Sequence, residues 1–323
     1  MTSKPTTSGL HHVTVTAGDP EPNAEFYVNI VGLRFVKRTV NHDDTDIYHF
    51  YFGDRKGTPG TNISFFPLLA NRLPGRNGAG QAETVAYVIP SDSVGYWEER
   101  LESKGVKVDH IERFGDPVLG FTDPDGVSLE LVASDTETDA EPWEGSPVPV
   151  EHQLRGFHSV TLAVEEFGPT VSVLTDVLGY SLEDESGGRR RYSTQDDGMG
   201  SVVDVVETDD ESGRMGIGVV QHVAFRASDD GELEEFRDAF ADHGLNVTRK
   251  VDRKYFNSIY CREPGGILFE VATEDPGFTV DEDVKSLGSR LVLPDWLEDR
   301  RDVIEERLPE FEFDPNLPTD GSS

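Results

Sequence analysis

Short stretches of alternating hydrophobic and polar residues recur along most of the chain, with amphipathic stretches between them. The first, LHHVTVT, places Val13 and Val15 on one face of a predicted strand, because neighbouring strand residues point to opposite faces. Asp19 and Pro20 then favour the start of a helix, which Gly32 ends. Three further strands, in LRFVKRTV, DIYHFYFG and TNISFFP, complete a βαβββ module.

This module is an internal repeat. Later modules open with ETVAYVI, GFHSVTLAV and QHVAFRA, so the chain holds four in all. GLHHVTVT matches GFHSVTLA, which pairs the first module with the third. DPDGVSLELVA matches EPGGILFEVAT, which pairs the second with the fourth. The pattern therefore predicts a duplicated two-module domain.

The predicted fold class is α+β, with four βαβββ modules in two tandem domains. The N-terminal domain covers residues 9–133 and the C-terminal domain 154–273, and an acidic, proline-bearing linker joins them at 134–153. A C-terminal extension, 274–323, carries a predicted helix near 294–308. We expect the final stretch, DPNLPTDGSS, to be mobile.

Charge is the most prominent feature of the composition. The chain has 62 acidic and 29 basic residues, a net charge of −33, and few of the basic residues are lysines. An acidic, lysine-poor surface is typical of a halophilic cytoplasm, where it keeps a protein hydrated and soluble. The alternative, an acidic disordered protein, does not fit the apolar strands that recur along the chain.

Several classes of function are disfavoured by the same composition. Nucleic-acid binding needs a basic face, which this balance of charges argues against. The chain has no apolar run long enough for a transmembrane helix, and MTSKPTTSG lacks the apolar region of a secretory signal. One cysteine, Cys261, permits neither an internal disulfide nor a thiolate metal cluster. We expect a cytoplasmic protein that binds neither membrane nor nucleic acid.

Three candidate metal ligands share one position within their strands. His12, His222 and Glu270 each lie on the face opposite the apolar residues that would pack against the module's helix. Two imidazoles and one carboxylate form the facial triad of non-haem Fe(II) oxygenases, which leaves positions open for substrate and O₂. A mid-strand glutamate between two apolar residues also needs a partner, because burying a lone carboxylate is costly.

The repeat provides an internal control for this site. The matching positions in the second and third modules are Thr84, Glu130 and Ser159, which keep the carboxylate and lack both histidines. We therefore predict one metal site, in modules one and four, and a vestigial one in modules two and three. His11 has a counterpart, His158, in the module without a site, so we expect it to be a structural neighbour of the ligand His12.

The fourfold βαβββ pattern resembles the vicinal oxygen chelate superfamily, which includes glyoxalase I and the extradiol ring-cleaving dioxygenases. This resemblance covers residues 9 to about 273 and implies sheets curled into open cups around one divalent metal. GLHHVTVTAGDPEPNAEFYVNIVGLRFVKRTV and DRKYFNSIYCREPGGILFEVATEDPGF are further similar to dioxygenases that cleave para-hydroquinones. That resemblance implies Fe(II) held by His12, His222 and Glu270.

The same resemblance implies that Tyr260 and Arg253 are active-site groups, through hydrogen bonding and through stabilisation of developing negative charge. Thr14 lies one step along the face of His12 and is a candidate for lining the pocket, with His11 a further candidate beside it. Gln221 stands where some relatives have a second histidine, so a proton relay there is not expected. Two other histidines, at positions 42 and 49, could stand behind the metal ligands, but a surface position is the expectation.

The function expected from these features is Fe(II)-dependent ring cleavage that inserts both atoms of O₂ into a hydroquinone- or catechol-type aromatic. Two alternatives stay open: a glyoxalase-like isomerase or lyase using Zn, Ni or Mn, and a non-enzymatic binding protein of the same fold. The former usually has four protein ligands, and three are found here. The same ligands suit Mn(II) as well as Fe(II), and the substrate and any homo-oligomer are left open.

Overall fold

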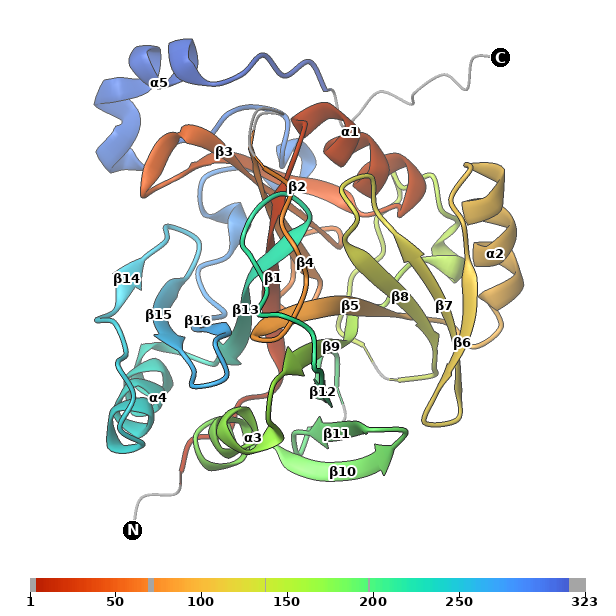
Figure 1. Ribbon diagram of the computed structural model, residues 1–323. Helices are drawn as coiled ribbons and strands as arrows, with labels where there is room; N and C mark the ends of the chain where they lie inside the picture. Colours follow the sequence, from red (N-terminus) through yellow and green to blue (C-terminus); the bar gives the residue numbers. More distant parts are fainter. Residues whose placement is uncertain (1–3, 69–72, 137, 197, 314–323) are drawn as a thin grey trace.

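The computed structural model describes residues 4–68, 73–136, 138–196 and 198–313, and its strands form two curled, eight-stranded mixed sheets (Figure 1). The first sheet has the strand order β14-β15-β16-β13-β1-β4-β3-β2. The second has the order β10-β11-β12-β9-β5-β8-β7-β6, which repeats the same topology. The expectation for 314–323 lies outside the described residues.

The bounds of the strands follow the predicted modules. The first sheet contains β1 (Leu10–Ala17), β2 (Arg34–Asn41), β3 (Asp44–Gly53), β4 (Asn62–Pro67), β13 (Val219–Ala227), β14 (Val251–Asp252), β15 (Asn257–Arg262) and β16 (Leu268–Thr273). The second contains β5 (Gln81–Ile89), β6 (Asp109–Arg113), β7 (Asp116–Thr122), β8 (Ser128–Ala133), β9 (Phe157–Val164), β10 (Ser181–Ser186), β11 (Arg189–Ser193) and β12 (Val202–Glu207).

One helix follows the first strand of every module. These are α1 (Pro20–Glu25), which continues as a π-helical stretch η1 (Phe26–Ile30), α2 (Val94–Ser103), α3 (Phe167–Asp176) and α4 (Asp230–Asp242). Short 3₁₀ turns lie at η2 (Val150–His152), η3 (Phe278–Val280), η4 (Val284–Ser286) and η5 (Asp295–Arg300), before the last helix, α5 (Arg301–Arg307). The α+β class and the fourfold βαβββ order are thereby confirmed.

The sheets join modules from opposite halves of the sequence. β1 pairs antiparallel with β13, so modules one and four share the first sheet, and β5 pairs with β9, so modules two and three share the second. Figure 1 shows this as red and orange strands continuing into teal and blue ones. Each sheet takes strands from both sides of residues 134–153. The division into two sequence domains at this linker therefore stays a prediction.

The helices cover the apolar face of each sheet. Asp229 caps α4 by accepting hydrogen bonds from the backbone N–H groups of residues 231 and 232, at 2.8 and 2.9 Å. Leu233, Phe236 and Phe240 follow at helical spacing and are buried in the core that also holds Val13, Val15, Val223, Phe225, Phe269 and Val271. Strand alternation then turns His12, His222 and Glu270 to the other face.

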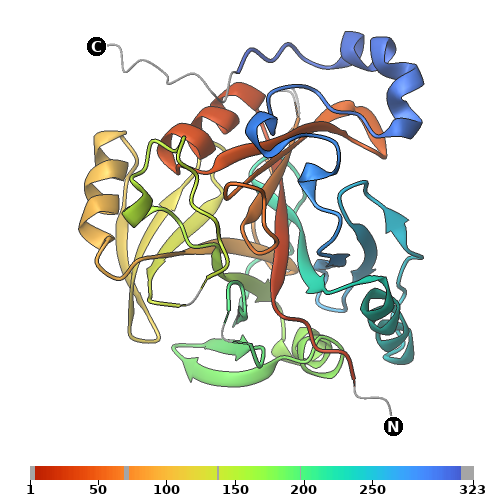
Figure 2. The ribbon, with the colours of Figure 1, turned by 180° about the vertical axis from the view of Figure 1, so that it is seen from behind.

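The C-terminal extension runs back along the first module (Figure 2). The buried ammonium of Lys37 contacts Asp281 at 2.7 Å, and Arg38 forms a parallel bridge with Leu291. The single helix expected near 294–308 is observed as the 3₁₀ turn η5 followed by α5. Phe311 then packs on Phe50, with ring centroids 4.7 Å apart.

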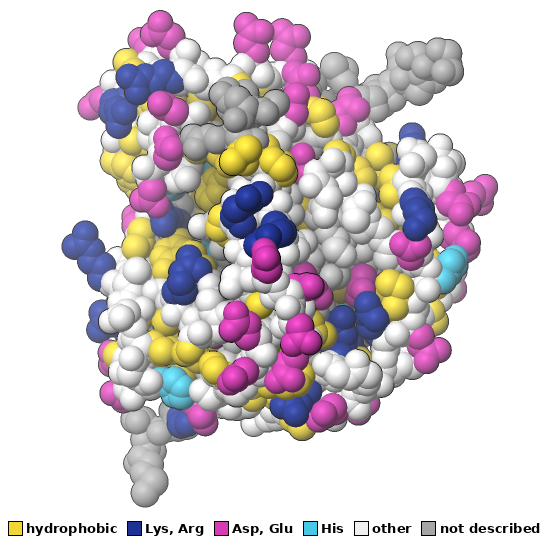
Figure 3. All heavy atoms as spheres, viewed as in Figure 1, with side chains coloured by type: hydrophobic (Ala, Val, Ile, Leu, Met, Phe, Trp, Pro, Cys, Tyr) yellow, Lys and Arg dark blue, Asp and Glu magenta, His cyan; other side chains and the backbone are white. Residues whose placement is uncertain are grey.

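The surface carries its acidic side chains dispersed among other types, as the face in Figure 3 shows. In the part of the chain that the structure describes, the helices are too short and too polar to cross a bilayer.

Candidate metal centre

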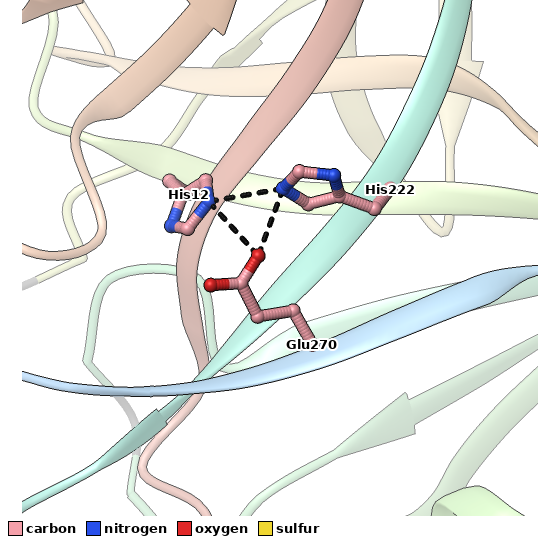
Figure 4. A group of neighbouring side chains, drawn as sticks. All are labelled: His12, His222 and Glu270. Carbon is pink, nitrogen blue, oxygen red and sulfur yellow. Dashed lines mark hydrogen bonds and ion pairs between the residues drawn. The ribbon is translucent and has the colours of Figure 1, made fainter. Parts of the chain in front are cut away.

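His12, His222 and Glu270 come from three neighbouring strands, β1, β13 and β16. Ala224 of β13 pairs with His12 on one side and with Glu270 on the other, and His222 lies two residues earlier on the same strand. Because side chains two residues apart share a face, all three lie on one face of the sheet around Ala224. Figure 4 shows the three side chains pointing toward one another. The register of the three strands therefore brings the two imidazoles and the carboxylate to one place.

The facing atoms of the three side chains are close together. His12 Nε2 lies 3.2 Å from His222 Nε2 and 3.4 Å from Glu270 Oε2, and the latter two atoms are 2.9 Å apart. Ligands about 2.1 Å from one ion lie about 3.0 to 3.4 Å from each other in octahedral or tetrahedral geometry. The spacing therefore fits one divalent cation without deciding which one.

Hydrogen bonds behind the histidines assign their tautomers. His11 Nε2 lies 3.1 Å from the Thr273 carbonyl, which can only accept, so this nitrogen carries hydrogen. Burial keeps the pKa of His11 well below its ordinary value, so the ring is neutral and its Nδ1 accepts from His12 Nδ1, 2.9 Å away. Gln221 Oε1 accepts from His222 Nδ1 in the same way. Both ligand histidines thus present a bare Nε2 to the centre.

Glu270 is buried and its two oxygens differ. Oε1 accepts a hydrogen bond from Ser258, whereas Oε2, which faces the two imidazoles, receives no hydrogen bond of regular geometry from the described residues. Burial alone would raise the pKa of Glu270, and only positive charge at this place, such as His12 and His222 carry when protonated, holds that pKa well below its usual value. Burial lowers the pKa of His222. An ionised carboxylate and two nitrogen lone pairs that face one another, with no proton between them, need a positive charge. The three residues therefore fit a metal ion.

A cavity of about 250 Å³ opens beside the triad. A cavity that takes up a benzene molecule is on the order of 150 Å³, so this one suits a single substituted ring. Besides the triad, it is lined by Asn41, His42, Asp43, His49, Tyr51, Phe66, Gln221, Arg253, Phe256, Tyr260 and Leu268.

Tyr260 and Arg253 lie together on the wall of this cavity. Arg253 Nε donates to the Tyr260 hydroxyl at 3.0 Å, and its guanidinium also contacts Asp43 at 3.0 Å. Burial raises the pKa of Tyr260, so the phenol stays protonated. Tyr260 and Asp43 raise the pKa of Arg253 against the opposing effect of burial. The wall therefore presents a neutral hydroxyl beside a fixed positive charge.

Thr14 and His11 lie behind the cavity wall. The Thr14 hydroxyl is 2.7 Å from that of Ser64, which in turn lies 3.0 Å from His49 Nε2, and the Tyr51 hydroxyl is 3.0 Å from His49 Nδ1. Thr14 thus reaches the cavity only through a chain of neutral hydrogen-bonding groups. His11 likewise contacts the site through His12.

The expectation of a surface position was wrong for His42 and His49. Both line the cavity, and the His49 ring lies between Tyr51 and Phe66, with centroid distances of 4.1 and 4.3 Å. Burial lowers the pKa of His42 to about 4 and that of His49 well below its ordinary value. Strand phase was the available signal for His49, because β3 turns Phe50 and Phe52 into the core and His49 and Tyr51 to the other face.

The matching place in the second sheet has the same register and different chemistry. Ala86 pairs with both Ser159 and Glu130, as Ala224 pairs with His12 and Glu270. The Ser159 hydroxyl is 2.9 Å from His158 Nδ1, and Arg113 donates to Glu130 Oε1 at 2.9 Å. Among the described residues, the one grouping of three or more His, Cys, Asp or Glu side chains arranged for a metal is that of His12, His222 and Glu270.

The chain matches the family model of the glyoxalase/bleomycin resistance protein/dioxygenase superfamily twice, over residues 9–131 and 156–271. It is 42% identical over 306 residues to MhqO of Bacillus subtilis (strain 168), named as a candidate ring-cleaving dioxygenase, covering 95% of this chain and 97% of that protein. It is 37% identical to a chlorohydroquinone/hydroquinone 1,2-dioxygenase of Sphingobium indicum, covering 92% and 94%.

Two solved structures share the fold of this chain. The crystal structure of a candidate dioxygenase from Bacillus subtilis superimposes with a TM-score of 0.92 and 41% identity, covering 95% of this chain and 98% of that one. Glyoxalase I from Zea mays superimposes with a TM-score of 0.60 and 16% identity, covering 82% and 92%, which shows likeness of fold alone.

Proposed function

Because this chain belongs to the glyoxalase/bleomycin resistance protein/dioxygenase superfamily, we propose that it is an Fe(II)-dependent ring-cleaving dioxygenase. It inserts both atoms of O₂ into a dihydroxylated aromatic ring of hydroquinone or catechol type. The observation that carries the proposal is a buried carboxylate that no Lys or Arg of the described residues neutralises, facing two bare imidazole nitrogens beside a cavity of the size of one ring. The name of the Sphingobium relative supports the hydroquinone side of this class.

His12, His222 and Glu270 would hold the iron. When bound there, Fe(II) supplies open positions for a substrate oxygen and for O₂ and the electrons through which the two react. Three protein ligands, where a glyoxalase-like isomerase usually has four, favour a reaction that needs several open positions. Within the described ranges no fourth His, Cys, Asp or Glu side chain joins the group.

The cavity wall supplies binding and charge. Phe256 and Phe66 offer apolar ring surface to a planar substrate. The Tyr260 hydroxyl can hydrogen-bond a substrate oxygen, and the guanidinium of Arg253 stabilises negative charge that forms on the substrate after it loses a proton. These two groups are already held against each other before a substrate arrives, which lowers the cost of orienting them.

A hydrogen-bonded chain beside the cavity can orient a substrate hydroxyl. Tyr51, His49, Ser64 and Thr14 are joined through distances of 3.0, 3.0 and 2.7 Å, and each can both donate and accept. Burial keeps the pKa of His49 well below its ordinary value, so the ring is neutral, with one nitrogen that donates and one that accepts. The chain can therefore orient a hydroxyl bound near Tyr51 without holding its proton.

O₂ uptake measured beside product analysis tests the proposal. The protein is loaded anaerobically with Fe(II) or Mn(II) and mixed with hydroquinones and catechols, and ¹⁸O₂ reports whether both oxygen atoms enter the product. We expect uptake with one ring-cleaved product and no activity in His222→Ala, while His158→Ala serves as the matched control. Full turnover in His222→Ala, or turnover that does not need O₂, contradicts the proposal.

We further propose that the protein works in a salt-rich cytoplasm and takes only a small aromatic substrate and O₂ as partners. Its net charge of −33 supports the first point, because added salt screens repulsion among acidic groups. Thermal unfolding at rising KCl concentration measures that dependence. A homo-oligomer stays a prediction, which light scattering in solution measures.

A further inference from the structure

The two sheets place an arginine in matching turns. Arg113 ends β6 and Arg253 follows β14, and each precedes a non-glycine residue with positive φ, Phe114 at 51° and Lys254 at 73°. Among the described residues these are the two non-glycine positions with such a backbone. A left-handed residue other than glycine is uncommon, so the shared feature shows that the two turns are equivalent in backbone conformation.

The two arginines have different partners. Arg113 donates directly to Glu130 at 2.9 Å and supplies the positive charge that this carboxylate needs. Arg253 donates to the Tyr260 hydroxyl and to Asp43, and the structure gives Glu270 no contact with it in the described chain. The equivalent carboxylate is thus neutralised by arginine in one sheet and left to the two histidines in the other.

One position accounts for the difference. Gly120 pairs with Glu130 across β7 and β8, and Tyr260 pairs with Glu270 across β15 and β16. Directly opposed residues share a face of the sheet, so a side chain at this position stands beside the carboxylate. At Gly120 the place of a side chain is taken by the end of the Ile111 side chain, and Arg113 reaches its carboxylate. At Tyr260 a ring stands there instead, and its centroid lies 5.1 Å from the Arg253 guanidinium carbon.

We propose that Tyr260 is a positioning residue that keeps Arg253 off Glu270 and so keeps the triad free for a metal. The proposal rests on the proposed function only in that the triad binds a divalent ion. An arginine cannot lose its proton in a protein, so a guanidinium on Glu270 would compete with the metal at every accessible pH. The contact with Asp43 does not hold the arginine by itself, because that carboxylate is 74% exposed and such pairs are weak.

Metal affinity of three variants tests this role without requiring turnover. Mn(II) is titrated into Tyr260→Gly, Tyr260→Phe and the double variant Tyr260→Gly/Arg253→Met, and free ion is counted by electron paramagnetic resonance. We expect about tenfold or greater loss of affinity in Tyr260→Gly, as for other groups that support a metal ligand, and a smaller loss in Tyr260→Phe. Removing the arginine in the glycine background should return affinity to near the wild-type value, and Arg253→Met alone should keep it.

The possible outcomes separate the two claims. Wild-type affinity in Tyr260→Gly overturns the inference, and so does a loss that the double variant does not restore, because the tyrosine then acts through packing. Thermal unfolding of each metal-free variant shows that the titrated protein is folded. A wild-type protein that binds neither Mn(II) nor Fe(II) instead contradicts the proposed function.

Discussion

The centres of the two sheets have the same frame and satisfy a buried carboxylate in different ways. In each sheet a central alanine pairs with a glutamate on one neighbouring strand and with a histidine or serine on the other. A third polar residue lies two residues before the alanine on its own strand. The second sheet pairs Glu130 with Arg113, and the first sets Glu270 against two histidines. The arrangement of the strands therefore fixes where a positive charge lies, while a few side chains decide whether it is an arginine or a metal ion.

The neighbouring strands repeat the contrast. Tyr51 and Ser64 pair across β3 and β4, and Arg191 and Asp204 pair at the matching place across β11 and β12. The first pair belongs to the neutral chain beside the cavity, whereas Arg191 binds Asp204 through two bonds of 2.9 and 3.1 Å. The second sheet therefore has an ion pair at the place where the first sheet has neutral groups that can both donate and accept hydrogen bonds.

The largest effect is expected from converting the first centre into the second. His12→Ser/His222→Thr installs the side chains of Ser159 and Thr84 and leaves Glu270 with no nitrogen ligands. We expect loss of metal binding and of O₂ uptake, because one buried carboxylate is a poor site on its own. Metal analysis after gel filtration checks this, with His158→Ser as the control. Stoichiometric iron in the double variant would show that the ligands lie elsewhere.

The reverse conversion should create a site. Thr84→His/Ser159→His supplies the nitrogens, but Arg113 still neutralises Glu130, so this variant alone should bind no second ion. Adding Arg113→Ala should raise the stoichiometry from one metal per chain to two, as measured by atomic emission. A second ion that binds equally well with Arg113 in place would remove the arginine from the explanation.

Acidification should lower the free energy of unfolding through His158, which lies in the second sheet. Burial, followed by the charge of Arg191, lowers its pKa to about 4, and Asp204 opposes this only in part. The folded state thus keeps His158 neutral while the unfolded chain takes up a proton below pH 6.5, so stability is lost as pH falls from about 6.5 toward 4.

His158→Phe should remove about 2 kcal/mol of that loss. Urea unfolding of the metal-free protein at pH 7 and pH 4.5 measures the difference between the variant and the wild type. An equal loss of stability in both would mean that His158 does not titrate in this range.

A smaller effect is expected from the histidine that precedes each centre. His11 assigns the tautomer of His12 through a bond of 2.9 Å, so His11→Phe should weaken Mn(II) binding by about tenfold. The equivalent change His158→Phe touches no ligand and should leave Mn(II) affinity unaltered. Equal affinities in His11→Phe and the wild type would show that the neighbour does not orient the ligand.

Local sequence patterns predicted the modules and the phase of each strand. His12, His222 and Glu270 could be chosen because alternation and an internal repeat act over a few residues and need no knowledge of the tertiary fold. The same reasoning applied to β3 would have found His49, since Phe50 and Phe52 mark the buried face.

Contacts between distant segments could not be predicted in this way. His42 lines the cavity with Asp43 and Arg253, which form an ion pair, and its ring lies 5.5 Å from that of Trp296. These neighbours come from different modules and from the C-terminal extension. The bond from Arg113 to Glu130 depends on the absence of a side chain at Gly120, which no periodicity reveals.

Anomalous diffraction from crystals loaded anaerobically with Fe(II) shows whether His12, His222 and Glu270 hold the metal. We expect one iron peak per chain, within bonding distance of Nε2 of His12, Nε2 of His222 and Oε2 of Glu270, and none near Glu130. A peak at Glu130, or an iron-loaded protein with no peak at the triad, would contradict this assignment.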